Sequence, residues 1–323
     1  MNTRNENKIS HIVLALALVI GSFSLFSITF GIEGVKYAGF YTTNQDRITE
    51  RAPRTNTTGT LFSFNSDTNV VESKYILQKL EKLGKINADS LLVGDLDTGE
   101  VIFERKPNTV YPIASVTKYM TAYTAAETFD PNELADITAE KLTVEGNRAR
   151  FVVGDSLTIR ELLYPLLLVS SNDAAEIIAQ QRNRDVFVAR MKEVAHGIGM
   201  GNTTFEDPTG LSKNNSSTAR DLFTMMREVR NTYPQIIDIS RLSFKENGHY
   251  LWQNINKAAS FAEFRGGKTG YTNAARQTSI GYYQIKLAND QIKNIGVVIL
   301  QSNTRLQDTR NILDYLKHYV AYL

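Results

Sequence analysis

A serine and a lysine three residues apart, Ser115 and Lys118, form the first pair in this sequence that could carry out nucleophilic chemistry. The Ala-, Met- and Thr-rich segment 115–129 predicts a helix, and residues i and i+3 lie on one helix face. The lysine amine would therefore reach the serine hydroxyl, and an amine that burial or neighbouring cations keep neutral can accept the hydroxyl proton. Roughly one Ser-x-x-Lys is expected by chance in a chain of this composition. A helix-capping serine beside a surface lysine is therefore the alternative.

A second polar cluster, Ser170-Ser171-Asn172, follows the apolar helical run 162–169 and is followed in turn by another predicted helix. Such a break directs polar side chains inward from a buried turn, at a cost in free energy that function would explain. Other Ser-x-Asn tripeptides begin at Ser63 and Ser212, but they interrupt no apolar helical run. An ordinary helix–turn–helix cap is the alternative interpretation.

A third cluster, Lys268-Thr269-Gly270, lies at the end of a predicted strand. Roughly 0.1 such tripeptides are expected by chance, so this signal is stronger than the other two. The lysine supplies positive charge, the threonine hydroxyl can bind a carboxylate, and Gly270 would let a substrate backbone approach closely. The alternative is a glycine-bearing edge strand with an exposed lysine.

The composition excludes several other kinds of site. The chain contains no cysteine, which rules out disulfides, thiolate metal ligands and cysteine nucleophiles. Three of its four histidines lie far apart with no serine or carboxylate pattern beside them, which disfavours a histidine metal site and a Ser-His-Asp triad. The balance of 36 Lys+Arg against 34 Asp+Glu gives no electrostatic case for nucleic acid. We therefore expect no metal, no cofactor and no nucleic-acid partner, and a lysine as the general base.

The elements that would position the three clusters follow an α+β order. Two short apolar runs flank Asp97-Thr98-Gly99 and predict a hairpin, and Thr158 and Glu161 have the spacing of a helix capping box. The predicted helices are 73–83, 115–129, 158–169, 174–181, 185–196, 218–230 and 306–320, and the predicted strands are 90–96, 101–105, 241–245, 264–269, 277–287 and 292–301. Strands from both ends of the chain would share one antiparallel sheet with helices on its faces.

The amino-terminal segment 12–32 is 21 residues long and carries no charge. At 1.5 Å per residue it would span the roughly 30 Å core of a bilayer, and the preceding Arg4 and Lys8 would stay on the cytoplasmic side. A cleaved signal peptide and a buried soluble helix are the alternatives. We therefore expect a cytoplasmic N-terminus at 1–11, a transmembrane anchor or signal segment at 12–32, a flexible linker at 33–73 and one enzyme domain at 74–323.

The ordered set of three clusters resembles the penicillin-binding proteins and serine β-lactamases. The blocks YPIASVTKYMTA, SSNDAAEIIA, DPTGLSKNNSSTARDL and GGKTGYTNAARQTS are similar to the low-molecular-weight D-alanyl-D-alanine carboxypeptidases, peptidase family S11, over about residues 74 to 323. The resemblance implies a β-lactamase/transpeptidase-like fold with a helical subdomain. It also implies that Ser115 is acylated by the stem peptide of peptidoglycan.

The resemblance assigns roles to the remaining site residues. Lys118 would accept the proton of Ser115, and Ser170 and Asn172 would relay protons and hold the substrate amide. The residues expected to bind the substrate, including its terminal carboxylate, are Lys268, Thr269, Gly270, Tyr271 and Arg305. Backbone N–H groups of Ser115 and Tyr271 would form the oxyanion hole. Arg276 departs from the pattern, since relatives commonly have glycine there.

The function implied is that of a serine-type D-alanyl-D-alanine carboxypeptidase. It would be a single-pass membrane protein with its catalytic domain outside the cytoplasm, and β-lactam antibiotics would be covalent inhibitors. The nearest alternative is a D,D-endopeptidase of the same family that cuts peptide crosslinks. A class A β-lactamase would need a glutamate in E-x-x-L-N, which the loop 206–211 lacks. An inactive wall-binding protein is the non-enzymatic alternative.

Overall fold

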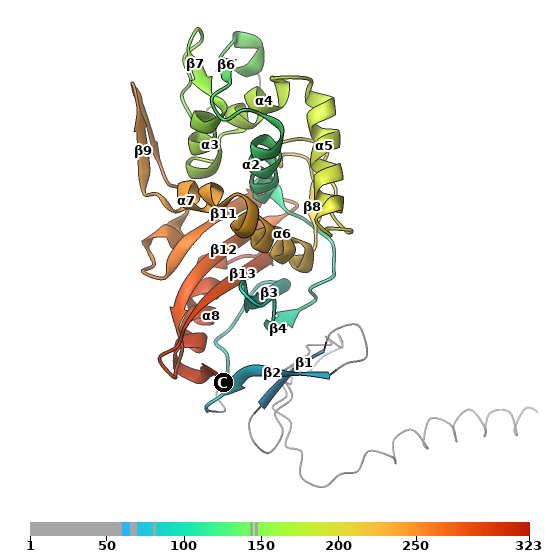
Figure 1. The fold of residues 1–323 in the computed structure, drawn as a ribbon, viewed down its shortest axis with the longest axis vertical. Coiled ribbons are helices and arrows are strands. Elements are labelled where there is room, and N and C mark those ends of the chain that lie inside the picture. The colour runs from blue at the N-terminus through green and yellow to red at the C-terminus, as the bar shows by residue number, and fades with distance from the viewer. Residues whose placement is uncertain (1–59, 65–69, 80–81, 143–144, 146–147) are drawn as a thin grey trace, which may run out of the picture. The chain divides into compact units, whose positions relative to one another are not determined.

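Five strands from both halves of the chain build one antiparallel sheet in the order β11-β12-β13-β3-β4 (Figure 1). The first half supplies β3 (Ser90–Asp95) and β4 (Val101–Arg105), which form the predicted hairpin. The second half supplies β11 (Phe264–Thr272), β12 (Arg276–Lys286) and β13 (Ile292–Ser302). The predicted α+β class and the sharing of one sheet by both chain ends are therefore confirmed.

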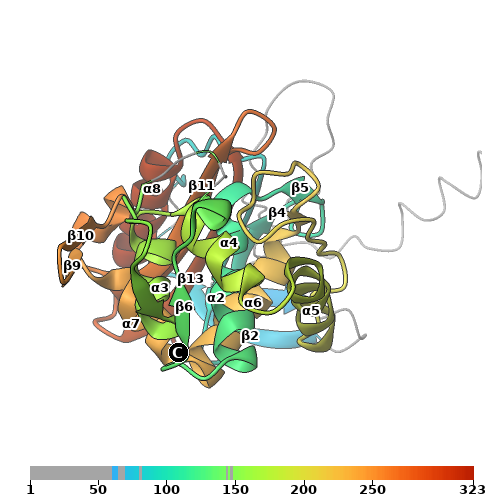
Figure 2. The same cartoon turned by 90° about the horizontal axis from the view of Figure 1, so that it is seen from above.

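The two faces of the sheet pack against different helices. Along β3, Leu91 belongs to the apolar cluster formed with helix α8 (Arg305–Tyr319), whereas Leu92 belongs to the cluster formed with α6 (Ala219–Thr232). Successive side chains of a strand point to opposite faces, so a strand with apolar residues at consecutive positions is covered on both sides. Figure 2 shows α8 on one side of the strands and α6 on the other.

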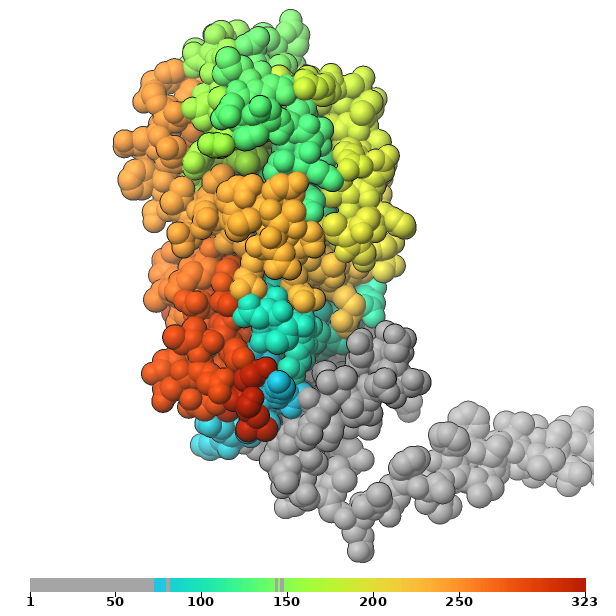
Figure 3. Space-filling model, in the orientation of Figure 1, coloured from blue at the N-terminus to red at the C-terminus, as the bar shows by residue number. Residues whose placement is uncertain are grey.

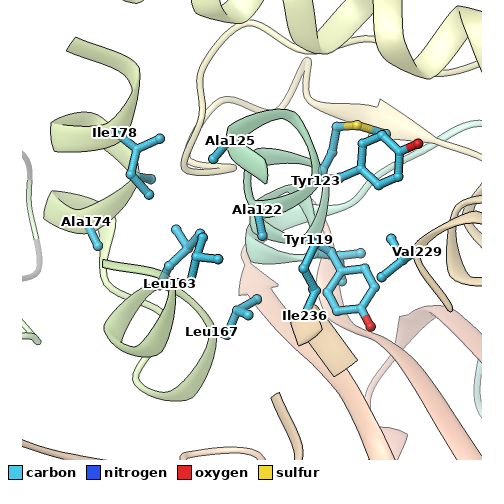
Figure 4. Packing of buried hydrophobic residues seen from close by; sticks show 14 of the residues in the cluster. Tyr119, Ala122, Tyr123, Ala125, Leu163, Leu167, Ala174, Ile178, Val229 and Ile236 are labelled. Atoms are coloured by element: carbon cyan, nitrogen blue, oxygen red, sulfur yellow. The ribbon is translucent and has the colours of Figure 1, made fainter. Parts of the chain in front are cut away.

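A helical region packs above the sheet around one central helix, α2 (Thr117–Thr128) (Figure 1). Every residue of α2 from Thr117 to Ala125 is buried, as expected for a helix enclosed on all sides. Figure 4 shows α3 and α4 on one side of it and α6 and α7 on the other, the contacts coming from Leu163, Leu167, Ala174, Ile178, Val229 and Ile236. The helices that surround it are α3 (Ile159–Leu168), α4 (Asn172–Gln180), α5 (Arg184–Gly197) and α7 (Pro234–Arg241).

Local hydrogen bonds explain where α3 and α4 begin. The predicted capping box is present, since the Thr158 hydroxyl accepts from the Glu161 backbone N–H at 3.1 Å and the Glu161 carboxylate accepts from the Thr158 N–H at 2.8 Å. The Ser171 hydroxyl caps α4 by accepting from the Ala174 N–H at 3.0 Å. The predicted break between the two helices is thereby confirmed, and Asn172 becomes the first residue of α4.

The predicted helix 73–83 is wrong, because this part of the chain forms strand β2 (Val70–Leu77). β2 pairs with β1 (Thr60–Phe64) and with β14 (Val320–Tyr322), which follows α8 at the end of the chain. These pairings outweigh the helical spacing of a few apolar residues. The domain boundary expected at residue 74 therefore falls inside β2.

A second difference lies between α6 and β11. The predicted strand 241–245 is mostly the end of α7 and a turn, and the hairpin that follows is formed by β9 (Phe244–Asn247) and β10 (Tyr250–Gln253). The remaining elements are short: β5 (Tyr111–Pro112), η1 (Ala114–Val116), β6 (Leu134–Asp136), η2 (Ala139–Leu142), β7 (Ser156–Thr158), β8 (Ser216–Ser217) and η3 (Lys257–Ser260). Figure 3 shows α6 and α7, in gold, between the green helical region and the orange and red strands.

The computed structural model describes residues 60–64, 70–79, 82–142, 145 and 148–323. Within these ranges, no helix combines the length and apolar character needed to cross a membrane. The expected anchor at 12–32 and the cytoplasmic segment at 1–11 lie outside the described residues.

Candidate active site

Ser115 lies in the short helical turn η1, directly before α2. The preceding residue, Ala114, is buried and has a φ of +48°, a left-handed conformation that is uncommon for a residue with a side chain. Such strain persists only where surrounding contacts fix the backbone. One of these contacts comes from the sheet, since the Thr278 hydroxyl of β12 donates to the Ile113 carbonyl at 3.0 Å.

The amine of Lys118 lies at the centre of the site and makes three polar contacts. Its Nζ is 3.2 Å from the Ser115 Oγ, 2.7 Å from the Asn172 Oδ1 and 2.5 Å from the backbone carbonyl oxygen of Thr209. The amide and backbone carbonyl oxygens can only accept hydrogen bonds. A neutral amine would use its two N–H bonds for them, which leaves the nitrogen lone pair for the Ser115 hydroxyl.

The surroundings of Lys118 favour this neutral form. Its side chain is fully buried, and burial lowers the pKa of Lys118 to about 7. The nearby Arg148 guanidinium also lowers the pKa, whereas the carboxylates of Asp207, Glu176 and Asp173 oppose that effect. Lys118 can therefore change protonation state near neutral pH, which is the property that a general base requires.

The second polar cluster meets the third one beside this pair. The Lys268 Nζ donates to the Ser170 Oγ at 2.9 Å and to the Thr269 carbonyl at 2.8 Å. Ser170 has a φ of +59°, so the break between α3 and α4 is held in a left-handed conformation. Asn172 is held by a second bond, from its Nδ2 to the Glu145 carbonyl at 2.7 Å.

Positive charge gathers around Lys268. Its side chain is 1% exposed, and burial lowers its pKa well below the usual value, to which Lys118, Arg305 and Arg148 add by charge repulsion. Burial also lowers the pKa of Arg305. An anionic ligand at this place would offset the repulsion among the buried cations.

Gly270 joins the sheet to the Ser115 segment. A Cβ at this residue would lie 2.8 Å from the Ser115 nitrogen and 2.9 Å from the Ile113 oxygen, so only glycine fits. The chain's own Ser115 segment thus approaches Gly270 closely. The approach of a substrate backbone to Gly270 stays a prediction. On its other side, the Gly270 carbonyl accepts from the Arg305 guanidinium at 2.6 Å. The next residue, Tyr271, has a side chain that is 63% exposed, so a role in the site would fall to its backbone N–H.

The structure brings together most of the side chains that the sequence singles out, namely Ser115, Lys118, Ser170, Asn172, Lys268 and Arg305, whereas Thr269 takes part through its backbone carbonyl. Sequence reasoning missed the contribution of Thr209, whose backbone carbonyl contacts Lys118. It also missed Asp207 and Thr278, which hold the surrounding loops. The Asp-Pro-Thr-Gly composition at 207–210 indicates a structured turn, but it does not indicate where that turn packs.

Comparison with known proteins gives a consistent result. Residues 77–303 match the model of the protein family described as D-alanyl-D-alanine carboxypeptidase, peptidase family S11. A solved structure of a D-alanyl-D-alanine carboxypeptidase from Mycobacterium tuberculosis is 28% identical, with a TM-score of 0.68. The superposition covers 74% of this chain and 94% of that one.

Two curated relatives are similar in sequence to this chain. A D-alanyl-D-alanine endopeptidase of Pseudomonas aeruginosa is 35% identical over 203 residues, which is 59% of this chain and 65% of that protein. A D-alanyl-D-alanine carboxypeptidase of Mycobacterium tuberculosis is 36% identical over 202 residues, which is 60% of this chain and 69% of that protein. The chain thus spans about two thirds of the length of these relatives.

Proposed function

Because this chain belongs to peptidase family S11, the D-alanyl-D-alanine carboxypeptidases, we propose that it trims peptidoglycan stem peptides through an acyl-enzyme on Ser115. The observation that carries the proposal is the position of the Lys118 Nζ, which contacts the carbonyl oxygens of Asn172 and Thr209 and lies 3.2 Å from the Ser115 Oγ. In the neutral amine, these two acceptors take the N–H bonds and leave the lone pair for the Ser115 hydroxyl. A serine with an adjacent buried amine is an activated nucleophile. The enzyme is therefore a serine-type hydrolase.

In the first step, the Ser115 Oγ attacks the carbonyl carbon of the penultimate D-alanine, and the hydroxyl proton passes to Lys118. The peptide C–N bond then breaks, and the terminal D-alanine leaves with a proton on its amine. Water next attacks the ester, which releases the shortened peptide and restores the serine hydroxyl. Asn172 contacts Lys118, and Ser170 contacts Lys268, so we assign them to proton relay and to holding the substrate amide.

The buried cations would bind the free carboxylate at the end of the stem peptide. Lys268 contacts Ser170, Thr269 follows Lys268 on the same strand and would offer its hydroxyl, and Arg305 is fixed to that strand through the Gly270 carbonyl. Carboxylate binding would offset the repulsion that lowers the pKa of Lys268. The backbone N–H groups of Ser115 and Tyr271 would stabilise the oxyanion. β-Lactams, which carry a carboxylate next to a strained amide, would acylate the same serine.

A D,D-endopeptidase is the second candidate, favoured by the similarity to the Pseudomonas aeruginosa endopeptidase. A β-lactamase is disfavoured by the loop that contains Glu206 and Asp207. Both oxygens of Asp207 accept hydrogen bonds from its own loop, and those of Glu206 accept from Ser212 and Asn214. Neither carboxylate is placed to activate a water molecule for rapid deacylation.

We also infer that the catalytic domain works outside the cytoplasm, tethered to the membrane by the apolar segment 12–32. The hydropathy of that segment and its positive flank support this inference. Fractionation of cells that produce the full chain, followed by N-terminal sequencing, separates an anchor from a cleaved signal peptide. Release of a chain that lacks these residues would support the signal peptide instead.

Two assays test the proposed activity. A fluorescent penicillin should label the wild-type chain covalently, and Ser115→Ala should abolish that label, whereas persistent labelling would remove Ser115 as the nucleophile. A pentapeptide stem should release free D-alanine. If the enzyme cleaves only crosslinked stem-peptide dimers, the endopeptidase interpretation replaces the carboxypeptidase one.

A further inference from the structure

The loop from Asp207 to Ser212 is built around one buried carboxylate. The Asp207 side chain is 8% exposed. Its Oδ1 accepts from the Thr209 N–H at 2.7 Å, from the Thr209 hydroxyl at 2.6 Å and from the Gly210 N–H at 2.6 Å. Its Oδ2 accepts from the Ser212 N–H at 2.8 Å. Four donors on one carboxylate fix the backbone of this short loop.

The other side of the same loop packs on the Ser115 segment and on α2. The Thr209 carbonyl accepts from the Lys118 Nζ at 2.5 Å, and the Pro208 carbonyl accepts from the Thr121 hydroxyl at 2.6 Å. Gly210 has a φ of +84°, and a Cβ there would lie 2.0 Å from the Ala114 carbonyl oxygen. The loop therefore contacts the backbone next to Ser115 and the amine of Lys118 at the same time.

We propose that Asp207 is a positioning residue for the reaction, which holds the Thr209 carbonyl on the Lys118 amine and Gly210 against the strained turn before Ser115. Asp207 itself is turned toward its own loop and contacts neither reactive atom. It acts through Thr209, because the carbonyl oxygens of Thr209 and Asn172 together determine which way the lone pair of Lys118 points. The proposal rests on the function proposed above, since it concerns the same base and nucleophile.

The charge of Asp207 provides a readout that a merely structural residue would lack. Burial lowers the pKa of Lys118, and Asp207 is the carboxylate that opposes this most. The other charged groups that face Lys118 are Glu176 and Asp173 on α4, Arg148 beyond the short helix η2, and Lys268 on β11. Replacing Asp207 with a neutral residue therefore moves the pKa of Lys118 downward while the other charges stay.

The deciding experiment measures the rate of acylation by a fluorescent penicillin across pH in the full chain. In Asp207→Asn, we expect the plateau rate at high pH to fall about tenfold or more, because the acceptor carbonyl is no longer held in place. We also expect the acidic limb of the profile to move to lower pH. A plateau within twofold of the wild-type rate, or a limb that stays at the wild-type pH, would overturn the proposal.

Matched variants separate position from charge and from folding. Glu206→Gln removes the neighbouring carboxylate, which is bound to Ser212 and Asn214 and has no contact with Lys118, and should leave both plateau and limb unchanged. Asp207→Glu keeps the charge but displaces it, so the plateau should fall while the limb stays at the wild-type pH. If Asp207→Asn does not fold, Asp207→Glu is the deciding variant. A plateau rate in Asp207→Glu equal to that of the wild type would overturn the proposal. Absence of labelling in the wild-type chain would instead refute the proposed function.

Discussion

At the scale of single residues, the site depends on two lysines, Lys118 and Lys268, that are buried close together although both are basic. Lys118 and Lys268 are both enclosed, and each is satisfied by neutral oxygen acceptors rather than by a carboxylate in direct contact. Burial without a paired carboxylate lowers the pKa of an amine. This is why a lysine can act here at neutral pH, where an exposed lysine would be protonated.

The pH dependence of acylation follows from the protonation of Lys118. In the proposed mechanism the neutral amine is the base, and burial lowers its pKa to about 7, so acylation should be slow at acidic pH and should rise to a plateau as the pH passes that value. Labelling rates measured with a fluorescent penicillin from about pH 5 to about pH 9 test this. A rate that begins to rise only near the ordinary pKa of lysine would show that Lys118 is not the base.

A negative charge placed beside Lys118 should shift the pH profile of acylation to higher pH. In Asn172→Asp, a carboxylate replaces the amide oxygen that lies 2.7 Å from the amine and favours the ammonium form. We expect the acidic limb to move to higher pH by about one to three units, with the acylation rate at pH 7 falling about tenfold or more. The control is Asn132→Asp, at an exposed residue on a separate loop. This variant should leave the pH profile of acylation unchanged. An unshifted limb in Asn172→Asp would contradict the contact.

At the scale of elements, backbone conformation rather than side-chain chemistry determines which residue types fit. Arg276 opens β12 with a φ of +50°, a left-handed conformation that costs a residue with a side chain about 1–2 kcal/mol. Its side chain is exposed, and the resemblance to the family places glycine at this position. Arg276 therefore occupies a position whose backbone conformation favours glycine.

Replacement of this arginine should stabilise the protein. In Arg276→Gly, the relief of the left-handed strain exceeds the entropy that glycine adds to the unfolded chain, so the free energy of unfolding should rise by about 0.5–1 kcal/mol. The same change at Lys192, an exposed residue inside α5, should lower it by about 1 kcal/mol. Urea unfolding of both variants measures the difference. A loss of stability in Arg276→Gly would show that the side chain makes a contribution larger than the strain.

The sequence predicts a helix or strand best where the residue pattern is long or includes a helix-capping residue. The capping box at Thr158 predicts helix α3, and strands β12 and β13 are predicted as two runs joined by a turn around Asn289-Asp290. The segment 73–83 was mistaken for a helix because its strand depends on pairing with β14, from the other end of the chain. Within the site, the motif side chains could be found from sequence. The Thr209 carbonyl could not, because every residue has a backbone carbonyl and only the fold brings this one to Lys118.

At the scale of the whole molecule, strand β2 ties the start of the described chain to its end and to the sheet. Tyr75 on β2 is fully buried, its ring contacts that of Tyr322 on β14 at 4.8 Å between centroids, and its hydroxyl donates to the Asp95 carboxylate at 2.6 Å. Strand β2 thus belongs to the structural support of the domain.

Substitution of Tyr75 should lower the stability of the protein without lowering its activity. In Tyr75→Ala, the cavity and the loss of the donor to the Asp95 Oδ2 should lower the free energy of unfolding by about 3–5 kcal/mol, whereas Tyr75→Phe, which loses only the hydroxyl, should cost about 1–3 kcal/mol. The folded protein should keep its wild-type rate of penicillin acylation in both cases. Denaturant unfolding and labelling at low temperature measure the two quantities. Equal stabilities, or a reduced acylation rate in folded Tyr75→Phe, would contradict this division.

The pairing of β3 with β13 has a consequence for how the enzyme becomes active. Partners such as Asp95 and Ile295 lie at opposite ends of the domain sequence, so the sheet closes only after nearly the whole chain is available. Contacts of such high sequence separation make folding slow, because loop-closure entropy must be overcome first. Thr278, which holds the Ser115 turn, lies on β12 next to β13, and Gly270 lies one strand further, on β11. A chain still emerging during synthesis therefore lacks the assembled candidate site, and the onset of acylation by a penicillin should report the last step of folding.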